Sequence, residues 1–201
     1  GEPFCVDCAR AGGEPRRCFR PSHVRLAAAF AFDEAVRAVI HAFKFGDAPE
    51  LAGPLVARAL ESTAFAQAPR PELVVAVPLH PLRRRERGYD QAALLARALA
   101  RRKGAPEASV LVRTRATRQQ AKLGARARAD NVRGAFAVVE PGLVEGRVVA
   151  LVDDVVTTGA TLRSAAEVLL AAGARRLPAV AVAFGPPGWL DDATSHRRPG
   201  G

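Results

Sequence analysis

Two adjacent aspartates precede a threonine-rich turn in residues 148–161, which read Val-Val-Ala-Leu-Val-Asp-Asp-Val-Val-Thr-Thr-Gly-Ala-Thr. The apolar start predicts a buried strand, so Asp153 and Asp154 stand at its carboxyl end, where open α/β sheets bind ligands. Ionised carboxylates only accept hydrogen bonds, which suits the vicinal hydroxyls of a ribose ring or a hydrated Mg²⁺. The pair therefore predicts a site for a sugar, a metal ion or both.

The turn after the aspartates has the composition of a phosphate cradle. It leads into a predicted helix, whose free N–H groups and positive dipole end attract anions, and Gly159 lets the backbone approach closely. The alternative is an ordinary strand-to-helix turn that is capped by threonine and binds no ligand. A Walker A loop is excluded because the sequence contains no Gly-Lys-Ser or Gly-Lys-Thr. The predicted phosphate-binding residues are Val155, Thr157, Thr158, Gly159, Ala160 and Thr161.

Three short apolar blocks, residues 73–77, 148–152 and 179–183, are continuous rather than alternating. Parallel strands covered on both faces have this pattern. Helical stretches at residues 91–102 and 162–172 lie between them, so the order is strand, helix, strand, helix. The predicted fold class is α/β, a doubly wound parallel sheet.

The flanking segments predict further divisions of the chain. A strand is expected at residues 24–32, followed by two helices with apolar residues at helical spacing before residue 61. We expect a Cys-containing appendage at residues 1–22, a main domain at 23–185 with a hood at about 23–70, and a flexible tail at 186–201. Within the main domain, the basic span 113–133 is poor in large apolar residues and is expected to be a mobile loop.

The net charge of +10 favours phosphorylated ligands or nucleic acid, although compositional bias of a whole proteome accounts for it equally well. The longest apolar runs are too short to span a bilayer. The first residues also lack the charged-then-apolar pattern of a secretory signal. Cytoplasm is the expected compartment.

Taken together, these segments resemble a known family. Residues 148–161 look like the 5-phosphoribosyl 1-pyrophosphate motif of type I phosphoribosyltransferases. Three further segments narrow the resemblance to the ComF/GntX family, and one of them, residues 40–45, resembles its upstream Leu-Lys-Phe-like helix. Residues 77–81 with 87–91 resemble its Val-Pro-Leu and Arg-Gly-Phe-Asn-Gln block, in which Asp90 replaces the usual Asn. Its second block is matched by Arg115, Thr117, Gln119, Leu123, Arg128, Asn131, Gly134 and Phe136.

The resemblance implies a type I phosphoribosyltransferase fold that binds 5-phosphoribosyl 1-pyrophosphate with Mg²⁺. It makes Asp153 and Asp154 catalytic through hydroxyls and metal-bound water, and it places Arg118 on a loop that closes over the reacting centre. The pyrophosphate would bind the loop after the first sheet strand; the residues implied there are Pro78, Leu79, His80, Arg83 and Arg87. For the arginines, a solvated basic turn is the alternative.

The acceptor would be recognised by the hood, where no residue specifies a base. Lys44 and His41 could face the cleft, but an amphipathic helix with a solvated lysine is the favoured interpretation. His80 fits a surface loop and a phosphate neighbour equally well.

Cys5 and Cys8 have zinc-knuckle spacing, and Cys18 with His23 would complete a tetrahedral zinc site in a segment without another means of folding. The other interpretation is that the three cysteines are reduced thiols in a flexible terminus of a cytosolic protein. Both remain open.

Two functions follow for the chain. One is an enzyme that transfers phosphoribosyl from its pyrophosphate donor to an unknown acceptor. The other is a ComF-like competence factor that handles single-stranded DNA, alongside other DNA-uptake proteins, and binds the ligand with little or no turnover. Fold alone does not choose between them.

If the zinc interpretation is right, protein purified without chelator contains about one zinc per chain, because a structural site is tetrahedral and closed. Losing Cys5 and Cys8 together should release the metal and open residues 1–22 to protease, while ligand binding at residues 157–161 persists. Elemental analysis is the measurement, and a metal-free protein would leave only the reduced-thiol interpretation.

Overall fold

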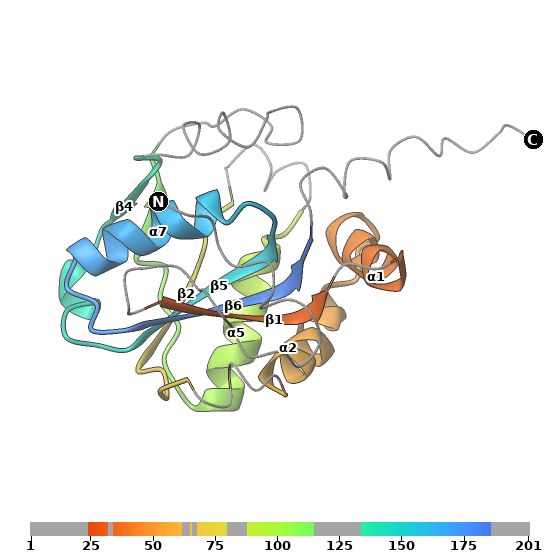
Figure 1. Ribbon diagram of the computed structural model, residues 1–201, viewed down its shortest axis with the longest axis horizontal. Helices are drawn as coiled ribbons and strands as arrows, with labels where there is room; N and C mark the ends of the chain where they lie inside the picture. Colours follow the sequence, from red (N-terminus) through yellow and green to blue (C-terminus); the bar gives the residue numbers. More distant parts are fainter. Residues whose placement is uncertain are drawn as a thin grey trace, which may run out of the picture.

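The structure is a computed structural model that describes residues 24–31, 34–61, 65, 68–79, 88–114 and 134–185. Its main sheet has the strand order β1-β6-β5-β2. These strands are β1 (Val24–Ala31), β2 (Leu73–Ala76), β5 (Val149–Val156) and β6 (Leu177–Phe184), and every pairing between them is parallel. All four carboxyl ends therefore lie along one edge of the sheet (Figure 1).

Helices cover both faces of the sheet (Figure 1), with α7 (Ala160–Ala171) on one face and α2 (Ala52–Leu60) and α5 (Gln91–Lys103) on the other. Side chains of a strand alternate between the faces. Leu151 accordingly packs in one buried cluster with residues of α7, whereas Val152 packs in a second cluster with residues of α5. Burial on both faces explains why the strands are continuous apolar runs, and it confirms the predicted doubly wound α/β class.

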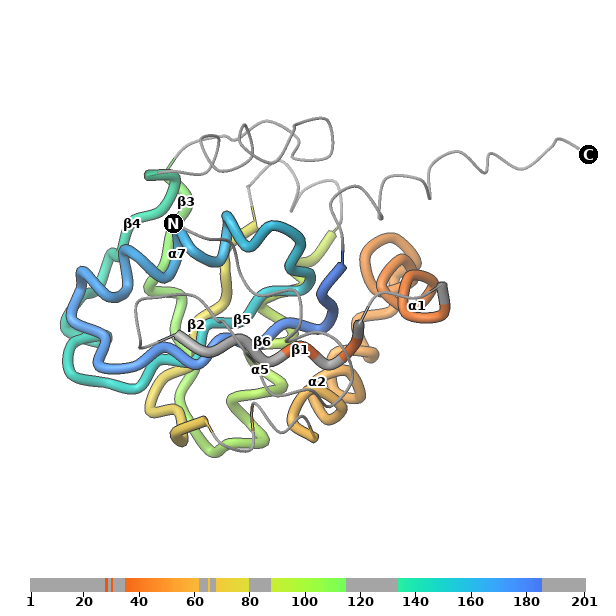
Figure 2. Tube along the Cα trace, in the orientation of Figure 1, coloured from red at the N-terminus to blue at the C-terminus, as the bar shows by residue number. Residues whose placement is uncertain are grey.

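Helix α1 (Glu34–Phe45) follows β1 after two residues, so it starts at the carboxyl edge of the sheet. The strand arrows of Figure 1 point towards the end of the sheet where α1 lies, and the tube of Figure 2 shows α1 in the same place. Its buried residues Val36, Ile40 and Phe43 join the cluster of α2 and α5. Short 3-10 turns at Pro49–Leu51 and Pro141–Leu143 precede α2 and β5 respectively.

The structure adds two features that the sequence patterns did not predict. First, β1 is part of the main sheet, because it pairs along its length with β6. Second, β3 (Leu111–Arg113) and β4 (Phe136–Val138) form an antiparallel pair. Each of these strands has three residues, too short for a periodic signal. They flank the expected loop, of which residues 115–133 lie outside the described part of the chain.

A polar contact joins three segments at the amino edge of the sheet, opposite the carboxyl ends. Glu72 accepts hydrogen bonds at Oε2 from the backbone N–H of Val148 (2.8 Å) and from Nη2 of Arg175 (2.8 Å). The bond from Val148, followed by the bond from Arg175, lowers the pKa of Glu72 below its ordinary value of 4.5. This carboxylate serves the fold at the edge away from residues 153–161.

Among the residues that the structure describes, no helix combines the length and apolar character needed to cross a membrane.

Candidate functional site

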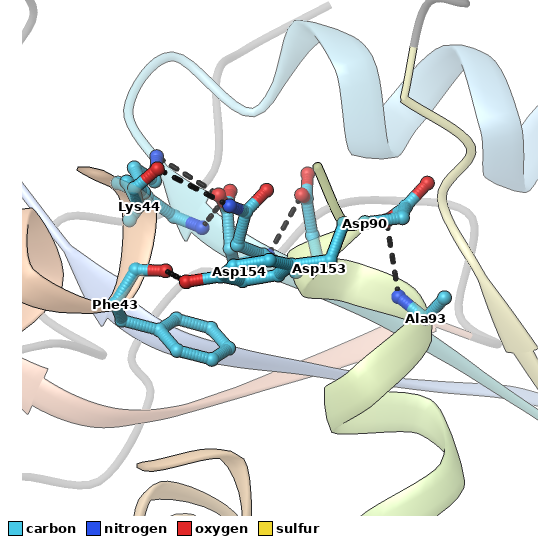
Figure 3. A network of polar contacts seen from close by, with 9 residues as sticks. Phe43, Lys44, Asp90, Ala93, Asp153 and Asp154 are labelled. Atoms are coloured by element: carbon cyan, nitrogen blue, oxygen red, sulfur yellow. Dashed lines mark hydrogen bonds and ion pairs between the residues drawn. The ribbon is translucent and has the colours of Figure 1, made fainter. Parts of the chain in front are cut away.

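The two aspartates lie at the carboxyl end of β5, between neighbouring strands β6 and β2. Residues 149–152 before them are fully buried, and Asp153 and Asp154 are half-buried. Because successive side chains of a strand point to opposite faces, the two carboxylates serve different surroundings. Asp153 lines a hollow with the following turn, and Asp154 reaches α1 (Figure 3).

The turn after β5 has the backbone expected of an anion cradle. Gly159 has φ 71°, a left-handed conformation that favours glycine, and α7 starts at the next residue. The hydroxyl of Thr158 accepts a hydrogen bond from the backbone N–H of Ala160 (3.4 Å). A small open hollow is lined by Asp153 and by residues 155–162. Seven of the eight residues predicted for phosphoribosyl and phosphate binding therefore line it, and Asp154 does not.

Asp154 is paired with a lysine of α1. Nζ of Lys44 lies 2.9 Å from Oδ2 of Asp154, and the exposed fractions of the two side chains are 8% and 16% (Figure 3). The favoured interpretation of Lys44 as a solvated residue is wrong. The spacing of residues in the sequence indicated that Lys44 is buried, because it continues the buried stripe of Val36, Ile40 and Phe43 at helical intervals. His41 is exposed, with its ring 5.0 Å from that of Phe45.

The pKa of Asp153 is raised from its ordinary value of 3.8 to about 8, first by burial and then by the neighbouring Asp154 carboxylate. The hydrogen bond that Asp153 accepts from the backbone N–H of Asp154 (2.8 Å) and the charge of Lys44 act in the opposite direction. Near neutral pH, Asp153 therefore carries a proton for much of the time, while Asp154 forms the ion pair with Lys44.

The start of α5 connects the site to its neighbours. Asp90 is the N-cap of α5, where Oδ1 accepts from the backbone N–H of Ala93 (3.1 Å) and Oδ2 accepts from that of Leu79 (3.1 Å). Tyr89 donates its hydroxyl to the carbonyl of Phe43 in α1 (2.7 Å). The segment thus joins the loop after β2, the first turn of α5 and the end of α1.

The remaining predicted residues divide into two groups. Pro78 and Leu79 lie directly after β2, near the carboxyl edge that holds the aspartates. The others lie outside the described residues; these are Cys5, Cys8, Cys18, His23, His80, Arg83, Arg87 and Arg118. In the described ranges, no cluster of three or more Cys, His, Asp or Glu side chains is placed to hold a metal.

The pKa of Asp153 predicts how Asp153→Asn changes stability with pH. A carboxyl whose pKa is raised by folding stabilises the native state fully below its unfolded pKa, and that contribution is lost as the pH rises through the folded pKa. The stability of Asp153→Asn relative to the wild type should therefore rise between about pH 4 and pH 8, by at most about 1.4 kcal/mol per pH unit.

Urea unfolding at several pH values measures this difference. The stability of Glu72→Gln relative to the wild type should change with pH in the opposite direction. The lowered pKa of Glu72 stabilises the fold at pH values above its ordinary pKa, and this contribution disappears on acidification. Parallel stability curves for Asp153→Asn and the wild type would contradict the raised pKa.

Comparisons with known proteins agree with this geometry. The family model of the phosphoribosyl transferase domain matches residues 89–198, more than half of the chain. The DNA utilization protein YhgH of Salmonella typhi is 34% identical over 182 residues, covering 85% of this chain and 79% of that protein. Competence protein F of Haemophilus influenzae is 38% identical over 109 residues, covering 53% of this chain and 48% of that protein.

Among solved structures, glutamine phosphoribosylpyrophosphate amidotransferase from B. subtilis is similar at 23% identity with a TM-score of 0.47, covering 71% of this chain and 30% of that chain. The family assignment depends on the family model and the curated relatives. The chain belongs to the phosphoribosyl transferase domain family and, within it, to the ComF group of type I phosphoribosyltransferase-like proteins.

Proposed function

We propose that the chain binds 5-phosphoribosyl 1-pyrophosphate and transfers its phosphoribosyl group to an acceptor. The observation that carries the proposal is the juxtaposition of an acid pair and a glycine turn at the carboxyl end of β5. Backbone N–H groups at the start of α7 suit the 5-phosphate, and carboxylates one turn away suit the sugar hydroxyls. The hollow, which Asp153 lines, and the neighbouring Asp154 carboxylate can therefore together receive both parts of a sugar phosphate.

The pyrophosphate would lie towards the loop after β2. Asp90 accepts a hydrogen bond from the backbone N–H of Leu79, which holds this first part of the loop beside the start of α5. Arg83 and Arg87, further along the loop, would contact phosphate oxygens in bidentate fashion. Arg118 would belong to the segment that closes over the reacting centre and excludes water from the sugar cation.

Mg²⁺ fits this site as a companion of the donor. It prefers oxygen ligands and keeps several waters, so a site with few protein carboxylates beside a phosphate cradle suits it. Asp153 faces the hollow and would contact the ion or its water, whereas Asp154 is engaged by Lys44. When bound, the ion supplies positive charge that stabilises the leaving pyrophosphate.

Donor binding should raise the melting temperature, because a ligand held only by the native state stabilises it. A concentration of 100 times Kd adds about 2.7 kcal/mol, which is about 5–10 °C for a domain of this size. Asp153→Asn combined with Asp154→Asn should abolish this shift. Glu72→Gln, which removes a carboxylate at the opposite edge, should retain it. The test is differential scanning fluorimetry with the donor and Mg²⁺, and an undiminished shift in the double variant would place the ligand elsewhere. Pyrophosphate release over candidate acceptors then measures turnover.

A second function, handling of single-stranded DNA during uptake, is favoured by the names of the relatives, a DNA utilization protein and a competence protein. The net charge of +10 is compatible with a polyanionic partner. In this proposal the sugar-phosphate site binds its ligand with little or no turnover, and other DNA-uptake proteins are the partners.

DNA binding of this kind should weaken steeply with salt, since each neutralised phosphate releases counterions. Replacing Arg83, Arg84, Arg85 and Arg87 by Glu should reduce the affinity and flatten the salt dependence. Reversing Arg101 and Arg102, exposed at the far end of α5, is the control and should have a smaller effect. The measurement is fluorescence anisotropy with a labelled oligonucleotide, with all variants compared at each of several salt concentrations. Equal affinities for both sets of variants would exclude the loop as a DNA contact.

A further inference from the structure

We propose that Lys44 is a positioning residue of the phosphoribosyl site: from α1 it holds the Asp154 carboxylate in place as the acceptor for a sugar hydroxyl. The proposal rests on the proposed function and deepens it, because it gives a residue of the hood, at about residues 23–70, a role in binding the donor. It follows from the contacts of the carboxylate, the anchoring of α1 and the burial of the ion pair.

Both oxygens of Asp154 are held. Oδ1 accepts the backbone N–H of Val155 (2.6 Å), and Oδ2 lies 2.9 Å from Nζ of Lys44. The first contact comes from the next residue of β5, so it holds the carboxylate relative to the strand. The second comes from another element and fixes the rotation of the side chain. Each carboxylate oxygen has further acceptor capacity, which a hydroxyl can use.

The lysine can do this because the end of α1 is itself anchored. The carbonyl of Phe43 accepts a hydrogen bond from the Tyr89 hydroxyl (2.7 Å), and the carbonyl of Lys44 lies 3.5 Å from Nε2 of Gln91. Carbonyls in the last turn of a helix lack partners within the helix. Two side chains at the start of α5 supply them here, so α1 is fixed next to the element that also holds Leu79.

Stability alone does not account for a lysine at this position. Replacing a buried ion pair by well-packed apolar residues is often neutral or stabilising, because desolvation offsets the attraction. The side chains of Lys44 and Asp154 are 8% and 16% exposed, so they carry much of that cost. A pair retained at the edge where ligands bind is better explained by the need to keep an ionised, oriented acceptor there.

The decisive measurement compares ribose 5-phosphate with 2,3-dideoxyribose 5-phosphate, which keeps the phosphate and the ring but lacks both hydroxyls. The ratio of their dissociation constants, obtained by calorimetry, isolates the contribution of the hydroxyls. For the wild type we expect a ratio of about ten or more, as for hydrogen bonds to charged groups. A change in the cradle or in overall folding would affect both ligands and leave the ratio unchanged.

Lys44→Met and Lys44→Gln should reduce the ratio by about threefold or more, and Lys44→Arg should restore most of it. Lys44→Gln keeps a polar donor, so it provides the test if the Met variant does not fold. Circular dichroism checks the folding of both variants. Lys103→Met is the matched control, because Lys103 lies over the Phe65 ring at the far end of α5. A wild-type ratio in folded Lys44→Met or Lys44→Gln would overturn the role of Lys44 alone. Failure of the wild type to bind 5-phosphoribosyl 1-pyrophosphate would overturn the proposed function and this inference together.

Discussion

Two neighbouring carboxylates stand half-buried at the carboxyl end of a central parallel strand, and this is the constraint on which the site depends. Like charges so close together, and partly removed from water, cannot both ionise freely. The structure divides them between two surroundings. Asp154 forms an ion pair with Lys44 of α1, and Asp153 faces the hollow with a raised pKa. The pair therefore offers one fixed acceptor and one carboxyl whose ionisation responds to what binds beside it.

The segment Tyr89-Asp90-Gln91 connects three elements near the carboxyl edge of the sheet. Tyr89 and Gln91 reach back to α1, and Asp90 holds both the loop after β2 and the first turn of α5. An aspartate is suited to this arrangement because its two separate oxygens serve two separate N–H donors. An amide would have a single oxygen for both donors.

The parts of the fold and site that the sequence could predict are those set by local pattern. Continuous apolar blocks identified β2, β5 and β6, because strands covered on both faces need no polar side. The position of residues 153–161, at the end of a strand and the start of a helix, could also be predicted from residue types. The pairing of β1 with β6 and the ion pair of Lys44 could not, since both depend on contacts between distant segments. Lys44 was misinterpreted because a lysine on an amphipathic helix usually reaches water, although its place in the apolar stripe indicated otherwise.

The position of β1 at the edge of the sheet has a consequence for biosynthesis. Its hydrogen-bonding neighbour in the sheet is β6, and Val24 pairs with Leu177, 153 positions later. At ordinary rates of translation, about 8–30 s separate the emergence of the two strands from the ribosome. During that interval β1 has no partner in the sheet, and α1 cannot yet be placed over the finished edge. The hood is therefore the first part of the described chain to be made and among the last to reach its native position.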